Sequence, residues 1–497
     1  MSNPAEEILT ARAPRGEPPR PAGRLRPSTL VCYGSGMLVQ DTLSVGMNTL
    51  LLFYLTVVCG LSGALAGGVL GLTLVADSFI DPLVGSISDN SHSRHGRRHP
   101  FMLGAILPIA VGFGLLFSVP IGLSGVGLAL YALIMVLVIR VGLSFFQVPY
   151  IALGAELSDD YAERSTIVAA RVLFTVIAGT SAAVLAYGVF LKGHDGQLHR
   201  AAYSPFAWTC GALVIAGGAL ATFGTLGSRG RLHAAASAQG SGLIAEVVEV
   251  FKNRSFCILF GACLILFVGL GFAGSLALHT NVYFWRLQPP QILLIALFLS
   301  GGYFAGVFAA MALTRRLEKR TIAMLGIGLI GVGQFTPVAL RVSGLIPVNA
   351  GLTWLIIATT TAGVGAACAL IGFQSMMADA ADEHEQLFGA RREGLYFAGI
   401  SFSAKASSGI GAMLAGFALD LIRFPHGVAG VAGAAPVHLA IPPGTILRLG
   451  LLNGPGAAAI TAVAILVLAL YRRGRAEHDQ VRESLASRRL SDGVVEA

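Results

Sequence analysis

Charged residues are scarce in this chain, and their scarcity excludes most classes of soluble protein. Only 12% of the 497 residues are Asp, Glu, Lys or Arg, whereas 55% are hydrophobic and the mean hydropathy is +0.73. The charges cluster between long apolar runs and do not spread around amphipathic faces. The sequence therefore predicts an all-α polytopic membrane protein.

Cysteine is rare, and the signatures of common enzymes are missing. The six cysteines are isolated and lack metal-site pair spacing, so we interpret them as small hydrophobic residues. The sequence contains no HExxH zinc pair, GxSxG elbow or GxxxxGKS/T phosphate loop. His92, His95 and His99 share one basic turn without a nearby cysteine, which favours loop residues over metal ligands. We expect neither an enzyme nor a bound cofactor.

The net charge of +8 does not indicate nucleic-acid binding. The basic residues fall in the N-terminal segment, in alternate turns and in the C-terminal tail, and no basic face carries interleaved aromatic residues. This distribution is a topology signal. It predicts that both chain ends lie in the cytoplasm. We expect the membrane to be a bacterial inner (plasma) membrane.

About twelve apolar segments are long enough to cross a bilayer. They cover 29–58, 62–88, 100–121, 125–157, 164–191, 204–228, 255–285, 290–314, 321–343, 350–378, 394–421 and 447–471. We expect two six-helix bundles, over 29–228 and 255–472. They are joined by a cytoplasmic linker, 229–254, whose part 243–251 has the spacing of an amphipathic helix. Residues 1–28 and 473–497 are predicted to be cytoplasmic tails, the first of them disordered.

Several polar residues lie inside these apolar segments, where a charge is costly. Asp77 and Asp81 are one helical turn apart on one predicted helix face. Steps of four and three place Arg140, Ser144 and Gln147 on one stripe of the fourth segment. The others are Asp41, Arg171 and Lys405. Two interpretations stay open: structural ion pairs between helices, or a hydrated site for a cation, a proton or a substrate.

A second group of charges lies at the predicted cytoplasmic ends of the helices. Two clusters occupy matching places in the two halves: Glu156, Asp159, Asp160 and Arg164, and Asp379, Asp382, Glu383, Arg391 and Arg392. We hypothesise a cytoplasmic gate in which acids of one bundle meet bases of the other. Solvated loop charges are the alternative, because exposed pairs contribute only about 0–1 kcal/mol.

An ordered set of motifs resembles the glycoside-pentoside-hexuronide:cation symporter family, a branch of the major facilitator superfamily. The motifs are Tyr33-Gly-Ser-Gly36 with Gln40 and Asp41, Asp77 to Gly85 (DSFIDPLVG), Pro149 to Glu156 (PYIALGAE), and Gln374 to Asp379 (QSMMAD) with Asp382. The resemblance implies the major facilitator fold, two six-helix halves with inverted repeats around a central cavity. It also implies that Asp77 and Asp81 serve the coupling cation, that Asp41 and Arg171 hold sugar hydroxyls, and that Lys405 lies near both sites.

The chain also departs from the family pattern. Gln147 stands where sugar carriers place an aspartate, and Ile151 and Ile371 stand where tryptophans flank a galactoside. Glutamine supplies no negative charge, and Arg140 would compete with a metal ion for the carboxylates, which favours proton coupling or a fixed salt bridge. The missing aromatic rings leave a larger or more apolar substrate open.

We therefore expect a monomeric symporter of a small organic solute, a sugar or glycoside, driven by Na⁺ or H⁺ and surrounded by membrane lipid. The alternatives are a carrier of lysolipids or other amphiphiles, and a transporter-like sensor without net flux. No metal is expected beyond a transported Na⁺ at Asp77 and Asp81. The coupling site is assigned to these two residues with Asp41, Gln147 and Lys405. The substrate site is assigned to Asp41, Arg140, Ser144, Gln147, Ile151, Arg171, Ile371, Ser401 and Lys405.

Overall fold

The computed structural model describes residues 25–89, 91, 97–158, 160–227, 243–347, 350–389, 392–427, 441–472, 474, 477, 480, 481, 483 and 484. Several predicted features lie outside the described residues: Asp159, Arg391, the side chain of Arg164, most of both tails and residues 228–242 of the linker.

The first half of the chain forms long helices from its apolar segments, because in lipid each backbone N–H and C=O must be satisfied within its own helix. The first crossing is interrupted and consists of α1 (Pro27–Gly34), α2 (Met37–Val45), the π-helical turns η1 (Gly46–Leu50) and η2 (Tyr54–Val58), and α3 (Leu51–Phe53). It is followed by α4 (Gly63–Asp89), α5 (His99–Leu116), α6 (Gly125–Glu156), α7 (Tyr161–Ala183) with η3 (Val184–Phe190), a short 3₁₀ turn η4 (Gly196–Leu198) and α8 (Arg200–Gly224).

The second half repeats this plan after α9 (Leu243–Lys252), which occupies the amphipathic part of the linker. Its elements are α10 (Arg254–His279) with η6 (Thr280–Phe284), α11 (Pro289–Leu313), α12 (Lys319–Val342), α13 (Gly351–Phe388), α14 (Glu393–Leu421), and α15 (Pro443–Leu451) with η8 (Leu452–Gly456) and α16 (Ala457–Leu468). Among the described residues, eleven helical stretches are long and apolar enough to cross a membrane. The 29-residue α14, which carries Lys405 and several serines, brings the long helices to the expected twelve.

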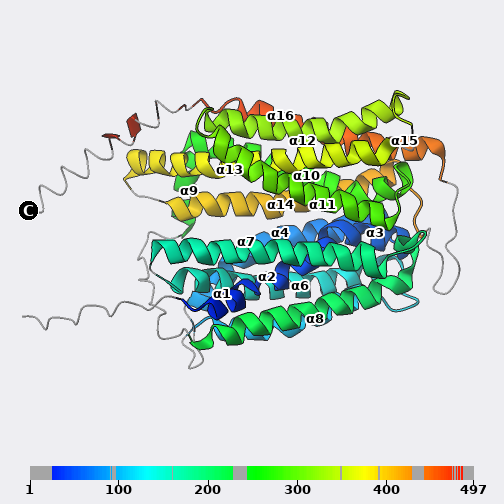
Figure 1. The fold of residues 1–497 in the computed structure, drawn as a ribbon, viewed down its shortest axis with the longest axis horizontal. Helices are drawn as coiled ribbons and strands as arrows, with labels where there is room; N and C mark the ends of the chain where they lie inside the picture. The colour runs from blue at the N-terminus through cyan, green and yellow to red at the C-terminus, as the bar shows by residue number, and fades with distance from the viewer. Residues whose placement is uncertain are drawn as a thin grey trace, which may run out of the picture.

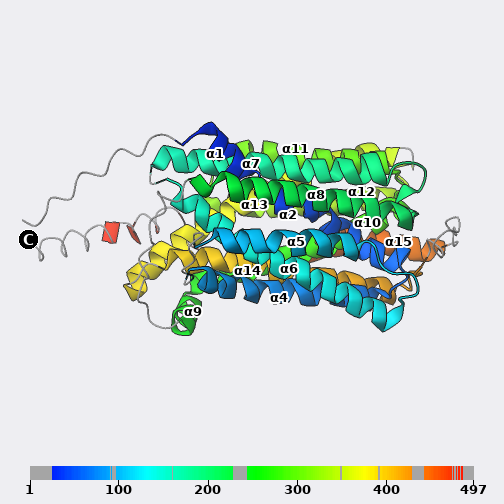
Figure 2. The same ribbon diagram turned by 90° about the horizontal axis from the view of Figure 1, so that it is seen from below.

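The two halves lie side by side with their helix axes roughly parallel (Figures 1 and 2). Helix α9 and the C-terminal end of α13 lie at one end of the bundle, here called the α9 end (Figure 1). Helix α15 lies at the other, the α15 end (Figure 1). Helices α12 and α16 form the edge of the second half farthest from α8 (Figure 1).

Helices α4 and α14 form the main contact between the halves through a row of glycines, here called the glycine seam. A Cβ atom on Gly416 would lie 2.1 Å from the carbonyl oxygen of Gly63, and one on Gly67 would lie 2.9 Å from the Cα of Gly416. Gly71 and Gly409 approach in the same way one to two turns farther along. Small residues permit this backbone contact, because lipid provides no hydrophobic drive between helices.

Helix α13 corrects one sequence prediction. Its apolar part was expected to end near residue 378, with Asp379 and Asp382 in the following loop. The helix instead continues to Phe388 and ends at Gly389, whose φ is +78°. The residues after 378 are good helix formers without Gly or Pro, and Gly389 supplies the left-handed C-terminal conformation. Charge ends a hydrocarbon-embedded segment, but it does not end a helix.

Candidate functional site

A cluster of four charged side chains joins the halves at the middle of α4 and α14. Asp77 and Asp81, four residues apart, both face α14. The ammonium Nζ of Lys405 lies 3.0 Å from Asp77 Oδ2 and 2.5 Å from Asp81 Oδ2. One lysine of the second half therefore bridges both carboxylates of the first half.

Helix α6 supplies the rest of the cluster. Ser144 Oγ donates a hydrogen bond of 3.0 Å to Asp77 Oδ1, and a guanidinium nitrogen of Arg140 lies 3.8 Å from Asp77 Oδ2. Two acids and two bases give the cluster a formal charge of zero, which offsets the cost of placing charges at membrane depth.

The cluster is asymmetric in both exposure and hydrogen bonding. The side chain of Asp77 is 3% exposed, whereas those of Asp81 and Lys405 are 29% and 36% exposed. Asp81 Oδ1 and Arg140 Nε have no hydrogen-bond partner among the residues that the structure describes. Asp81 thus keeps one unused carboxylate oxygen beside an accessible lysine.

A second polar group lies within the first half. Gln147 Nε2 donates a hydrogen bond to Gln40 Oε1. On the next residue of α2, Asp41 faces Thr175 and Arg171 of α7. Within the described chain, Gln147 Oε1 and Asp41 Oδ2 have no hydrogen-bond partner. Both oxygens are buried and keep unused capacity to accept hydrogen bonds.

Two stacked tyrosines support this group. Tyr33 and Tyr150 have ring centroids 4.6 Å apart, and the hydroxyl of Tyr150 donates to the carbonyl of Tyr33 at 2.9 Å. The guanidinium of Arg171 interacts electrostatically with both tyrosines and with Asp41. The stack therefore holds α1, which carries Tyr33, against α6, which carries Tyr150.

The structure separates some residues that the sequence grouped. Ser144 and Arg140 reach Asp77, but Gln147 of the same stripe binds Gln40, which the sequence prediction left outside the site. Its position beside Asp41 inside an apolar segment was the available signal.

The three remaining predicted substrate residues differ in their surroundings. Ser401 is exposed one turn before Lys405 on α14, and Ile151 is exposed one turn after Gln147 on α6. Ile371 instead packs with the apolar cluster of Ala310, Ile322 and Cys368 between α11, α12 and α13. Ser401 and Ile151 thus share helix faces with the site, whereas the described apolar contacts of Ile371 lie within the second half.

The α15 end is closed by hydrogen bonds between the halves. Both carboxylate oxygens of Asp420 accept backbone N–H groups at the start of α4, from Gly63 at 2.8 Å and Ala64 at 2.7 Å. The Thr56 hydroxyl and His279 Nε2 share a hydrogen bond of 2.9 Å, and the Thr56 carbonyl accepts from the Gly427 N–H at 3.0 Å. These contacts hold the halves together beyond the glycine seam.

Two of the predicted gate residues at the α9 end, Glu156 and Asp379, make ion pairs with residues of their own half. Glu156 binds Arg97 at 2.7 Å and Arg98 at 2.6 Å, all within the first half. Asp379 binds Lys319 at 2.7 Å in the second half. Asp160 accepts the backbone N–H of Glu163 at 2.9 Å and so caps α7. Asp382 lies on the extended α13.

Arg392, the last described gate residue, joins the linker helix to α14. Its guanidinium binds Glu246 of α9 at 2.8 Å, directly before α14 begins. The gate hypothesis requires acids of one half to pair with bases of the other half. None of the ion pairs described above tests it, so it stays a prediction.

The known proteins that this chain resembles are transporters. Residues 32–472 match the family described as MFS/sugar transport protein. An uncharacterised symporter of Synechocystis sp. is 24% identical over 95% of this chain and 99% of its own length. The isoprimeverose transporter of Lactiplantibacillus pentosus is 25% identical over 75% of this chain and 76% of its own. Among solved structures, the nucleoside transporter NupG covers 90% of this chain and 100% of its own with a TM-score of 0.62 at 12% identity, a likeness of fold.

Proposed function

This chain belongs to the MFS/sugar transport protein family, and from that premise we propose that it carries a glycoside-like solute by cation-coupled symport. The α9 end, which holds the basic loops, is the cytoplasmic end in this proposal, and the membrane is a bacterial plasma membrane. The halves rock about the glycine seam and expose the central site to each side in turn.

The observation that carries the proposal is the bridge from Lys405 to Asp77 and Asp81. An incoming cation competes with the ammonium group for the same carboxylates, because both are attracted by the same negative charge. Since Lys405 belongs to the other half, ion binding changes the interaction between the halves. That is the coupling free energy a symporter requires.

The geometry favours a proton over a sodium ion. A hard metal cation collects several oxygen ligands. Ser144, Arg140 and Lys405 already occupy both oxygens of Asp77, and Lys405 occupies one of Asp81. A proton needs only one oxygen, and Asp81 Oδ1 has no partner in the described part of the chain. We therefore assign Asp81 as the proton carrier.

Substrate recognition is assigned to the polar group around Gln147 and Asp41. Their oxygens without partners can accept hydroxyl hydrogens, and Arg171 supplies donors at the same place. A sugar presents such hydroxyls along one face. The isoprimeverose transporter among the relatives supports this class of substrate.

The test is uptake into proteoliposomes of labelled glycosides, with pH and sodium gradients imposed separately. A pH unit is equivalent to about 1.36 kcal/mol and supports roughly tenfold accumulation in one-to-one symport. Asp81→Asn should abolish accumulation but preserve exchange of labelled for unlabelled substrate. Asp195→Asn, which neutralises a carboxylate in a loop at the α15 end, is the matched control.

Two results would overturn the assignment. Accumulation driven by sodium alone would exclude the proton as the coupling ion. Unchanged accumulation in Asp81→Asn would remove the cluster from the coupling mechanism. A panel without any transported glycoside would reject the substrate class while leaving the coupling site to be tested with other solutes.

A further inference from the structure

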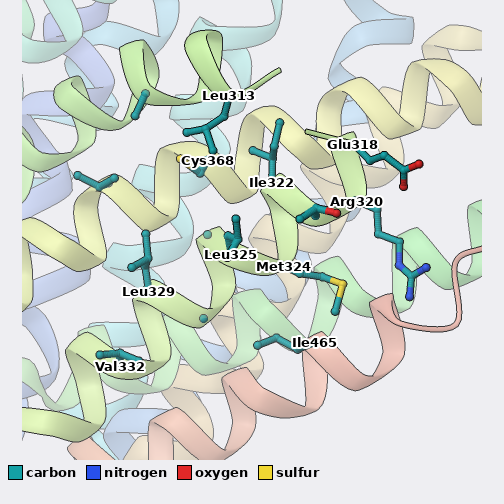
Figure 3. Close-up of a pocket in the computed structure, with 15 residues that line it drawn as sticks. Leu313, Glu318, Arg320, Ile322, Met324, Leu325, Leu329, Val332, Cys368 and Ile465 are labelled. Carbon is teal, nitrogen blue, oxygen red and sulfur yellow. The ribbon is translucent and has the colours of Figure 1, made fainter. Parts of the chain in front are cut away.

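A groove of about 700 Å³ lies on the second half (Figure 3), and none of the residues of the charge cluster lines it. It is lined by residues of α11, α12, α13 and α16. Gly328 of α12 leaves open space in the lining, and Leu325, Leu329, Val332 and Ile465 are among the apolar side chains around it. The lining is therefore suited to a hydrocarbon chain.

The groove faces the membrane. Helices α12 and α16 form the outer edge of the second half (Figure 1). Leu325 and Val332 are 49% and 56% exposed, although both are large and apolar. Such exposure on a membrane-spanning helix indicates contact with lipid, because lipid is as apolar as these side chains.

The length of the groove fits one leaflet. Along α12 it runs from Arg320 to Val332, a distance of about 18 Å at 1.5 Å per residue. Half of the hydrocarbon core of a bilayer is about 15 Å thick. The groove thus reaches from the membrane surface at the α9 end to roughly the midplane.

The mouth of the groove carries one acid and one base. Glu318 and Arg320 lie together at one end of the lining, beyond the apolar side chains (Figure 3). Arg320 donates from one terminal nitrogen to the carbonyl of Ala469 at 2.8 Å, and its buried Nε has no partner among the described residues. The other terminal nitrogen of Arg320, for which the described residues supply no partner, can bind a phosphate, and the carboxylate of Glu318 can bind an ammonium group.

We infer that this groove is a binding site for a phosphatidylethanolamine molecule of the leaflet at the α9 end. One acyl chain lies along α12, the phosphate binds Arg320, and the ammonium binds Glu318. An anionic headgroup such as phosphatidylglycerol fits less well, since it offers no positive charge to Glu318. The inference is independent of the proposed solute and coupling ion.

Photolabelling of the full-length protein in nanodiscs tests the site. The probe is phosphatidylethanolamine with a photoactivatable acyl chain, competed by unlabelled phosphatidylethanolamine or phosphatidylglycerol. Gly328→Leu fills the groove, because a Cβ there meets nothing within 4 Å. Gly331→Leu is the matched control, since Gly331 is equally open but lies outside the lining.

The expected results separate the chain contact from the headgroup contact. Displacing about two methylene groups should lower labelling of α12 roughly tenfold in Gly328→Leu and leave it unchanged in Gly331→Leu. Glu318→Gln should reduce the preference for phosphatidylethanolamine over phosphatidylglycerol about threefold. Equal labelling of the two glycine variants would overturn the site. Equal competition by both lipids in the unmodified protein would overturn the headgroup assignment.

Discussion

Asp420 joins the two halves at the α15 end, and its removal should open that end. The carboxylate caps α4 from the other half through two hydrogen bonds of 2.7 and 2.8 Å. Loss of an acidic N-cap costs about 1–2 kcal/mol. When the halves separate at this end the bonds are broken in any case, so Asp420→Ala destabilises only the closed state. The ratio of open to closed molecules should therefore rise by a factor of about 5–30.

The assay is a distance distribution between two spin labels across the α15 end. Cysteines replacing Ile121 of the first half and Leu345 of the second are suitable label sites, because both positions are highly exposed. The six native cysteines are replaced beforehand. Asp420→Asn, which keeps one acceptor oxygen, should shift the distribution less than Asp420→Ala. Leu421→Ala, the adjacent exposed residue, is the control and should not shift it.

A long-distance population in Asp420→Ala within twofold of the unmodified protein would refute this reasoning. It would mean that the cap stabilises α4 equally in both states and does not distinguish them. A variant that unfolds would be recognised by loss of the short-distance peak as well, and Asp420→Asn then decides the question.

Three further outcomes follow from described contacts. Lys405→Ala should abolish gradient-driven uptake and lower the free energy of unfolding in detergent by less than the roughly 3–5 kcal/mol of a fully buried pair, because Lys405 is partly exposed; unchanged uptake would contradict the bridge. Gly67→Val should destabilise the folded protein, because a Cβ at position 67 would lie 2.9 Å from the backbone of α14. Gly68→Val is the control and should not destabilise it, because a Cβ there meets nothing within 4 Å. Equal unfolding temperatures for the two variants would contradict this prediction. Arg392→Gln should raise amide hydrogen exchange in α9 about two- to fivefold, as expected for loss of a partly exposed ion pair with Glu246, and unaltered exchange would show that this pair does not stabilise α9.

Much of the fold could be predicted from the sequence, because length and hydropathy decide which segments cross a membrane. The family match confirms the resemblance and the major facilitator fold that it implied. The extension of α13 was missed, since hydropathy reports where lipid ends and says nothing of where a helix ends.

The site was predicted in its residue types and only partly in its contacts. Spacing placed Asp77 and Asp81 on one face, and the family resemblance placed Lys405 near them. The bridge itself depends on how the halves pack, since Asp81 and Lys405 are 324 residues apart in the sequence. The cap by Asp420 is likewise invisible in the sequence, because a helix is ordinarily capped by its own preceding residue. Tertiary partners of this kind require coordinates.

The glycine seam between α4 and α14 has a mechanical consequence. Backbone meets backbone at Gly63, Gly67 and Gly416, and the side chains of Met413 and Leu74 pack against Gly71 and Gly409, so few interdigitated side chains must be withdrawn before one half tilts against the other. The seam can act as a fulcrum, with Asp420 on one arm and the Lys405 bridge on the other. In the proposed mechanism, a tilt that loosens the contacts at one arm tightens those at the other, so a proton that binds Asp81 would change contacts at the opposite face of the membrane.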